Sequence, residues 1–80
     1  MRNENDRVDA ILAGMSYDRK IGVIKLVREV TGLGLAEAKH FIEHLPQTLK
    51  RDISEEEGWE LHNRFHDLGA QVSTQPSSRP

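Results

Sequence analysis

Two pairs of histidines in the sequence have the spacing of metal ligands. His40 and His44 form one pair and His62 and His66 form the other, with the second member four positions after the first. On a helix this spacing places two imidazoles on the same side of adjacent turns, where they can chelate zinc or nickel. A metal site is therefore one interpretation of both pairs.

The alternative is that these histidines are ordinary surface residues. Neither pair has an evident third ligand, although Glu43 or Asp67 could serve as one. The H-E-x-x-H pattern of metalloproteases is absent. We favour surface histidines on solvated helix faces, and we expect no metal and no other cofactor.

Catalytic chemistry has little support from the sequence. The chain has no cysteine, which excludes thiol catalysis, disulfides and Cys-based zinc sites. Serine, histidine and aspartate are present, but there is no nucleophile elbow, no glycine-rich phosphate loop and no paired-carboxylate motif. We expect the protein not to be an enzyme.

The segment T-G-L-G-L-A-E-A-K, residues 31–39, could serve either of two purposes. Two glycines between helices can bring backbone N–H groups to a DNA phosphate, as in helix-hairpin-helix motifs. That use predicts Lys or Arg directly after the second glycine, whereas Leu35 and Ala36 stand there. We favour a tight corner, in which Gly32 ends a helix with a positive φ and Gly34 lets two helices approach closely. We do not expect nucleic acid as a partner.

The helix expected before this corner has an unusual second face. Ile21, Ile24, Lys25 and Arg28 recur at positions i, i+3, i+4 and i+7, so they fall on one side of a helix. This face could be an exposed apolar patch ringed by positive charge, which suits an acidic protein partner, and Lys39 of the next helix could join it. Alternatively, both isoleucines are buried under a neighbouring element and the cationic stems cover the edge.

Periodicity and capping residues predict the elements that carry these side chains. Ser54 and Glu57 form a capping box before the third helix, and Gly69 follows its end. Residues 8–14 fit both a strand and a helix, so this element is ambiguous. The expected helices span residues 19–31, 35–45 and 55–68, and the expected strands span residues 47–53 and 70–74.

Two single residues depart from the pattern of plain helices. Gly22 lies inside the first helix, where it costs roughly 1 kcal/mol relative to alanine, so we expect a close contact there. Trp59 lies on the third helix near His62 and His66. It could be partly exposed as a second contact surface, or it could fold over the chain after Pro46.

The order of elements predicts an α+β domain. Strand, helix, helix, strand, helix and strand imply three helices on one face of a small three-stranded, mostly antiparallel sheet. A chain of 80 residues forms one domain with a small core. We expect the domain over residues 7–75, between disordered ends at residues 1–6 and 76–80.

Charge and hydropathy narrow the class of protein further. The net charge is −2, but residues 19–45 hold five basic and three acidic side chains, so the middle of the chain is cationic. This field is too weak for nucleic acid and suits an acidic protein partner. No apolar run approaches the roughly 20 residues needed to span a bilayer, and no secretory signal is visible. We expect a cytoplasmic protein without a membrane partner.

Two long segments resemble a known family. K-I-G-V-I-K-L-V-R-E-V-T-G-L-G-L-A-E-A-K, residues 20–39, looks like the signature of the C-terminal domain of the acidic bacterial ribosomal stalk protein, the multicopy protein of the large subunit. Residues 53–72 are similar to the last helix and final strand of that domain, and V-D-A-I-L, residues 8–12, to its first strand. The resemblance covers residues 7–74 and implies the same α+β fold, with a strand at residues 8–14.

The resemblance also implies a function. In that family the domain recruits translational GTPases, such as elongation and initiation factors, to the ribosome and stimulates their GTP turnover, without catalytic residues of its own. The factor-contacting positions lie on the first two helices. In this sequence the matching partner-binding residues are Lys20, Ile21, Ile24, Lys25, Arg28, Leu35, Glu37 and Lys39.

Some features depart from the family pattern. The family's dimerisation region and Ala-rich hinge are absent from these 80 residues, so we do not expect ribosome anchoring in the family's way. Ala36 stands where the family usually has a lysine, and Trp59 and the histidines replace mostly small or charged residues. An alternative function is therefore a ribosome-independent adaptor or regulator that uses the fold for another acidic protein partner.

Overall fold

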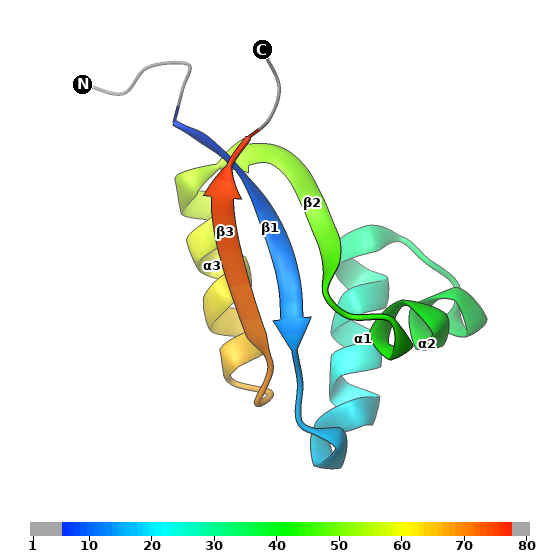
Figure 1. Cartoon of the computed structure of the whole chain (residues 1–80). Coiled ribbons are helices and arrows are strands. Elements are labelled where there is room, and N and C mark those ends of the chain that lie inside the picture. The colour runs from blue at the N-terminus through cyan, green and yellow to red at the C-terminus, as the bar shows by residue number, and fades with distance from the viewer. Residues whose placement is uncertain (1–5, 78–80) are drawn as a thin grey trace.

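The structure is a computed structural model that describes residues 6–77, and its elements follow the expected order (Figure 1). The expectations of disorder at residues 1–5 and 78–80 lie outside the described residues. The β-α-α-β-α-β order confirms the predicted α+β class. The elements are β1 (Arg7–Gly14), a 3-10 turn η1 (Tyr17–Arg19), α1 (Lys20–Thr31), α2 (Leu35–Glu43), β2 (Gln47–Ser54), α3 (Glu55–His66) and β3 (Gln71–Pro76).

The ambiguous first element is the central strand of the sheet. The strand order is β2-β1-β3, and β1 is antiparallel to both neighbours. Val8, Ala10 and Leu12 alternate along β1 and are all buried, because they face the helices. The two-residue alternation therefore outweighs the partial helical spacing of this segment once strands pair on both sides.

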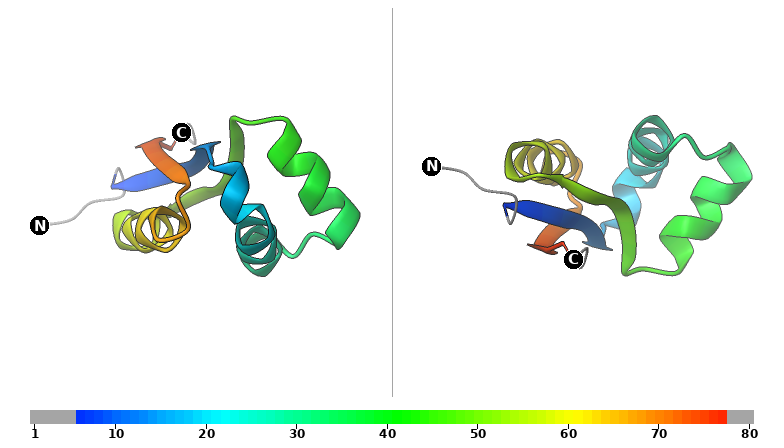
Figure 2. Two further views of the ribbon diagram at one scale, coloured as in Figure 1. Left: turned by 90° about the horizontal axis from the view of Figure 1, so that it is seen from below. Right: turned by 90° about the horizontal axis from the view of Figure 1, so that it is seen from above.

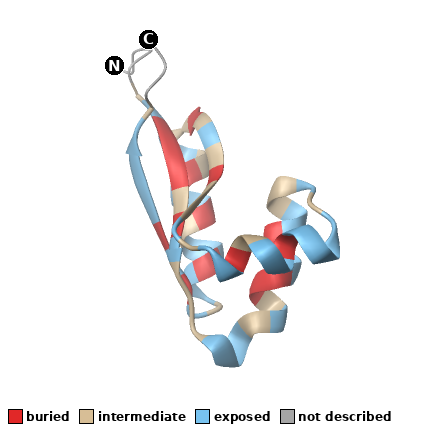
Figure 3. Ribbon diagram, turned by 45° about the vertical axis from the view of Figure 1, so that its right-hand side comes forward, coloured by how far each residue is buried: buried red, intermediate tan, exposed pale blue. Residues whose placement is uncertain are grey.

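On one side of this sheet, α1 and α3 cover the strands, whereas α2 packs against α1. Figure 2 shows α1 and α3 beneath the sheet, while α2 lies beyond α1, towards the β2 edge. The core between these layers contains Leu12, Val23, Val27 and Phe65, all fully buried. Burial continues across the α1–α2 contact, whereas the outer surface of α2 is exposed (Figure 3). This position leaves the outer side of α2 exposed to solvent along the length of the helix.

Several element boundaries differ by one or two residues from the sequence-based expectation. The second helix ends at Glu43 rather than at residue 45, and His44 is its C-cap. The final strand continues to Pro76, which pairs with Val8, and the Ser77 amide donates to the Arg7 carbonyl at 2.9 Å. The strand therefore ends two residues later than the predicted residue 74, because pairing with β1 extends it.

The start of α3 shows half of the predicted capping box. The Ser54 hydroxyl accepts a hydrogen bond from the Glu57 amide at 3.0 Å, as predicted for an N-cap. The Glu57 carboxylate, however, contacts Lys50 Nζ at 2.9 Å. The reciprocal bond is thus replaced by an ion pair between β2 and α3.

Candidate functional site

The outer side of α1 carries Ile21, Lys25 and Arg28, which we call the α1 stripe. All three are exposed, and Ile21 is 84% exposed. Ile24 was expected on the same face, but it is only 6% exposed and belongs to the core with Ala38 and Ile42 of α2. The expectation of an exposed Ile24 is wrong because three residues of helix turn its side chain about 60° back from Ile21, towards the buried side.

The start of α2 supplies further exposed residues. Leu35 is 49% exposed and Lys39 is exposed, although the apolar spacing of α2 also suggested a core position for Leu35. Glu37 is exposed as well, and its Oε1 accepts a hydrogen bond from the Gly34 amide at 3.0 Å. Lys20 is half-buried at the start of α1. We define the α1–α2 surface as the α1 stripe together with Leu35 and Lys39.

The basic residues of the chain divide into two groups by their contacts. Five of those in residues 6–77 touch a carboxylate or a backbone carbonyl: Arg7, Arg19, Lys50, Arg51 and Arg64. The side chains of the other four make no hydrogen bond or ion pair within the same range: Lys20, Lys25, Arg28 and Lys39. The cations without an internal partner are thus those that the sequence marked as partner-binding, and their charge is available to another molecule.

The glycine corner between α1 and α2 uses its own backbone N–H groups. The Gly32 amide donates to the Arg28 carbonyl at 2.8 Å, the Leu33 amide to Thr31 Oγ1 at 3.2 Å, and the Gly34 amide to Glu37. A phosphate would have to displace these bonds and approach the Glu37 carboxylate. The arrangement argues against the helix-hairpin-helix use of this segment.

The two glycines of the corner have different roles. Gly32 has φ +80°, a left-handed conformation that closes α1 as predicted. Gly34 has φ −74°, and a Cβ there would meet only Glu37 Oε1, at 3.4 Å. Close helix approach is therefore not what Gly34 provides. It is the N-cap of α2, held by the Glu37 side chain.

Tyr17 is an exposed aromatic residue that the sequence reasoning missed. It is 73% exposed and lines a shallow hollow of about 390 Å³ with Lys20, Ile21 and Gly22. Its position four residues before Ile21 is the signal that could have placed both side chains together. The hollow extends the apolar part of the α1 stripe beyond the start of the helix.

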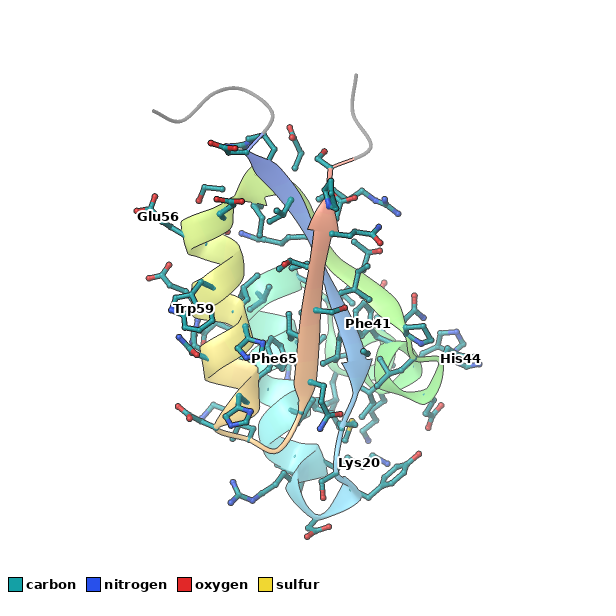
Figure 4. The ribbon with its side chains drawn as sticks, turned by 60° about the vertical axis from the view of Figure 1, so that its left-hand side comes forward. Lys20, Phe41, His44, Glu56, Trp59 and Phe65 are labelled. Atoms are coloured by element: carbon teal, nitrogen blue, oxygen red, sulfur yellow. The ribbon has the colours of Figure 1, made fainter. Side chains whose placement is uncertain are left out.

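Trp59 belongs to a separate stacked group on α3. Its ring is 64% exposed and stacks on His62, with ring centroids 5.5 Å apart. His62 also stacks on His66 at 5.9 Å and its Nδ1 lies 2.8 Å from the Val72 carbonyl. Figure 4 shows Trp59 on the outer side of α3, away from the α2 residues Phe41 and His44. Of the two alternatives left open for Trp59, the structure supports the exposed position beside the histidines.

The described part of the chain has one buried charged residue, Asp9, and it has a structural role. Its side chain is 2% exposed, and its Oδ1 accepts a hydrogen bond from the Asp52 amide at 2.9 Å. Asp52 lies at a register shift of β2 with φ 57°, so this bond holds the irregular backbone beside β1. Asp9 Oδ2 lies 3.9 Å from Arg51 Nη1. Because Asp9 holds the irregular backbone of β2, we assign it a structural role and not a catalytic one.

Together these features define a small α+β domain that offers exposed helical surfaces to other molecules. The chain belongs to the ribosomal protein L7/L12 C-terminal domain family, whose family model matches residues 8–75. The resemblance in the sequence is therefore confirmed over nearly the whole domain.

Individual relatives agree with the family. The large ribosomal subunit protein bL12 of Bacillus licheniformis is 48% identical over 69 residues, which cover 86% of this chain and 55% of the relative. The protein of the same name from Acinetobacter baylyi is 56% identical over 54 residues, covering 68% of this chain and 45% of the relative. Protein bL12c of Cyanidium caldarium is 40% identical over 67 residues, covering 84% and 52%. This chain spans about half the length of these relatives.

No helix within residues 6–77 is both long enough and apolar enough to cross a bilayer.

Proposed function

We propose that this chain is a non-enzymatic protein-binding domain of the cytoplasmic translation apparatus, which recruits a translational GTPase through the α1–α2 surface. One observation carries the proposal: Lys20, Lys25, Arg28 and Lys39 have no internal partner within residues 6–77 and accompany the exposed Ile21 and Leu35. An exposed apolar group with unpaired cations around it matches the anatomy of a protein interface.

Each part of the surface has a distinct task in this proposal. Ile21 and Leu35 lose contact with water when they pack against aliphatic side chains of the partner. Lys25 and Arg28 pair with acidic residues at the rim, while Lys20 and Lys39 attract the partner before contact. Because exposed charges are screened over about 10 Å at 0.1 M salt, association should slow as salt rises.

The relatives support the translation setting. The similar proteins of Bacillus licheniformis and Cyanidium caldarium are large ribosomal subunit proteins by name, and the family match covers the part of the chain that carries the α1–α2 surface. The GTPase and the ribosome remain proposals for this chain, since it spans about half of the relatives' length.

An NMR titration of the ¹⁵N-labelled chain with a bacterial elongation factor tests the proposal. We expect chemical-shift changes at the amides of Ile21, Lys25, Arg28, Leu35 and Lys39, and none at Trp59. Unchanged shifts at a saturating concentration of factor would refute it.

A parallel titration with an unrelated acidic protein separates the adaptor alternative. If the acidic protein shifts the amides of the α1–α2 surface and the elongation factor does not, the surface serves another partner and the GTPase proposal is wrong. If only the elongation factor shifts these amides, the GTPase proposal stands.

A further inference from the structure

Three side chains at the end of α2 converge outside the α1–α2 surface. His40, Glu43 and His44 are all exposed, and one ligand atom from each lies within 4.8 Å of the other two. Among residues 6–77 this is the one group of three or more His, Cys, Asp or Glu side chains with such convergence. The sequence pattern H-F-I-E-H places them at i, i+3 and i+4, within about 100° of the helix circumference.

The backbone prepares His44 for metal binding. His44 is the C-cap of α2, and its Nδ1 lies 2.9 Å from the His40 carbonyl oxygen. Since a carbonyl only accepts, Nδ1 is the donor, and in the neutral ring the lone pair therefore sits on Nε2. Metal-bound histidines usually show this arrangement, because the second hydrogen bond fixes the tautomer and aims the ring.

The three ligand atoms, which lie within 4.8 Å of one another, must move closer together to bind one metal ion. Ligand atoms of a tetrahedral zinc site lie about 3.4 Å apart, given metal–ligand distances of about 2.0–2.1 Å. The rings of His40 and His44 have centroids 4.2 Å apart and a tilt of 34°. All three side chains are exposed and Figure 4 shows His44 on the outer side of the molecule, so rotation about their side-chain bonds is unobstructed by the core.

The donor types select the class of ion. Two imidazole nitrogens and one carboxylate oxygen suit zinc, nickel or copper, whereas calcium and magnesium prefer oxygen ligands throughout. The C-terminal end of α2 also carries the partial negative charge of the helix dipole, which favours a cation.

We propose that His40, Glu43 and His44 form a binding site for one divalent transition-metal ion, with Zn²⁺ as the reference ion. All three ligands come from one chain, so uptake requires no second copy. At least one coordination position remains for water.

The second histidine pair provides an internal control. His62 and His66 have the same spacing, and the Nδ1 of His62 also bonds to a carbonyl. Their rings, however, are stacked almost parallel, with an interplanar angle of 12°, and no third ligand joins them among residues 6–77. His62 is also half-buried against Trp59. This pair should not bind the ion.

Calorimetric titration of the full chain with Zn²⁺ at pH 7.5 tests the proposal. We expect one ion per chain. His40→Ala, Glu43→Gln and His44→Ala should each weaken binding about 10-fold or more, because each removes one ligand. The double variant His62→Ala/His66→Ala should stay within about twofold of the original chain.

Folding controls keep the result interpretable. Thermal unfolding in the presence of a chelator should be unchanged by substitutions at these exposed positions, so a loss of binding reports the ligands. The proposal is overturned if Zn²⁺ does not bind, if Glu43→Gln leaves affinity unchanged, or if only the His62/His66 variant loses the ion.

Discussion

Ile21 and Ile24 are the same residue type three positions apart on α1, but they have opposite surroundings. Ile21 is 84% exposed beside Tyr17, whereas Ile24 is 6% exposed in the core. Under the proposed function, Ile21 contributes to partner binding, whereas Ile24 contributes to the stability of the domain.

Substituting each isoleucine by alanine separates these roles. Ile24→Ala should lower the free energy of unfolding by about 2–5 kcal/mol, because it leaves a cavity in the core. Ile21→Ala should change that free energy by no more than about 0.5 kcal/mol, since it removes no buried contact. Urea denaturation followed by circular dichroism measures both values. Similar losses for the two variants would contradict the observed burial.

For single residues, helical spacing predicted which side chains share one side of a helix better than it predicted which of them are buried. The spacing placed Ile21, Lys25 and Arg28 on one side of α1, where all three are exposed, but it placed Ile24 there as well, and Ile24 is buried. The spacing could not locate the boundary of burial, which depends on where α2 packs. Tyr17 was missed because it precedes the helix, outside the periodic pattern that drew attention to α1.

Two glycines lie at close contacts, one between α3 and the sheet and one between α1 and the segment after α3. A Cβ on Gly58 of α3 would lie 3.1 Å from Val8 Cγ2 and 3.1 Å from Thr74 Cγ2, on β1 and β3. A Cβ on Gly22 of α1 would lie 3.2 Å from Leu68 Cδ2. The first contact involves β-branched residues, which are stiff at χ1, whereas the second involves the far end of a half-buried leucine.

Glycine-to-alanine substitutions should therefore differ between the two helices. Both gain up to about 1 kcal/mol of helix propensity. Gly58→Ala should nevertheless destabilise the domain, by a net of up to about 2 kcal/mol, because overpacking costs about 1–3 kcal/mol. Gly22→Ala should be neutral or stabilising, since Leu68 can move. Thermal melts of both variants give the comparison, and a Gly58→Ala domain more stable than the original would refute this explanation of α3 packing.

Local sequence signals predicted most elements. The Ser54 cap and the positive φ of Gly32 are consequences of capping residues, and the structure confirms them. Pairing in the sheet was less predictable, because β1 is a strand only through its two neighbours and β3 gains Pro76 from β1. The end of α2 at Glu43 was likewise unmarked by a glycine.

The whole molecule has an uneven distribution of charge. Glu55, Glu56 and Glu57 form the acidic first turn of α3, and two of the other acidic residues, Asp52 and Glu29, pair with arginines. The cations without an internal partner in residues 6–77 gather on α1 and α2. Net charge alone, at −2, would not have indicated a site for an acidic partner, whereas its segregation does.

The family could be recognised from sequence because its motifs span both the glycine corner and α3. The use of the surface could not be inferred with the same ease, since it depends on which cations lack an internal partner. Lys50 and Arg64 carry the same positive charge as Lys25, but Lys50 pairs with Glu57 and Arg64 pairs with Glu29.

The dissociation constant for a bacterial elongation factor, measured on two charge-matched variants, is the sharpest test of factor binding by α1 and α2. Lys25→Gln/Arg28→Gln and Asn63→Glu/Gln75→Glu each lower the net charge by two, but only the first changes the α1–α2 surface, and all four positions are exposed. We predict that the first variant binds about 2- to 30-fold more weakly, since an exposed charge pair contributes about 0.2–1 kcal/mol and two pairs are lost. The second should bind within about twofold of the original chain. Equal weakening of both variants, or none in either, would contradict a factor-binding site on α1 and α2.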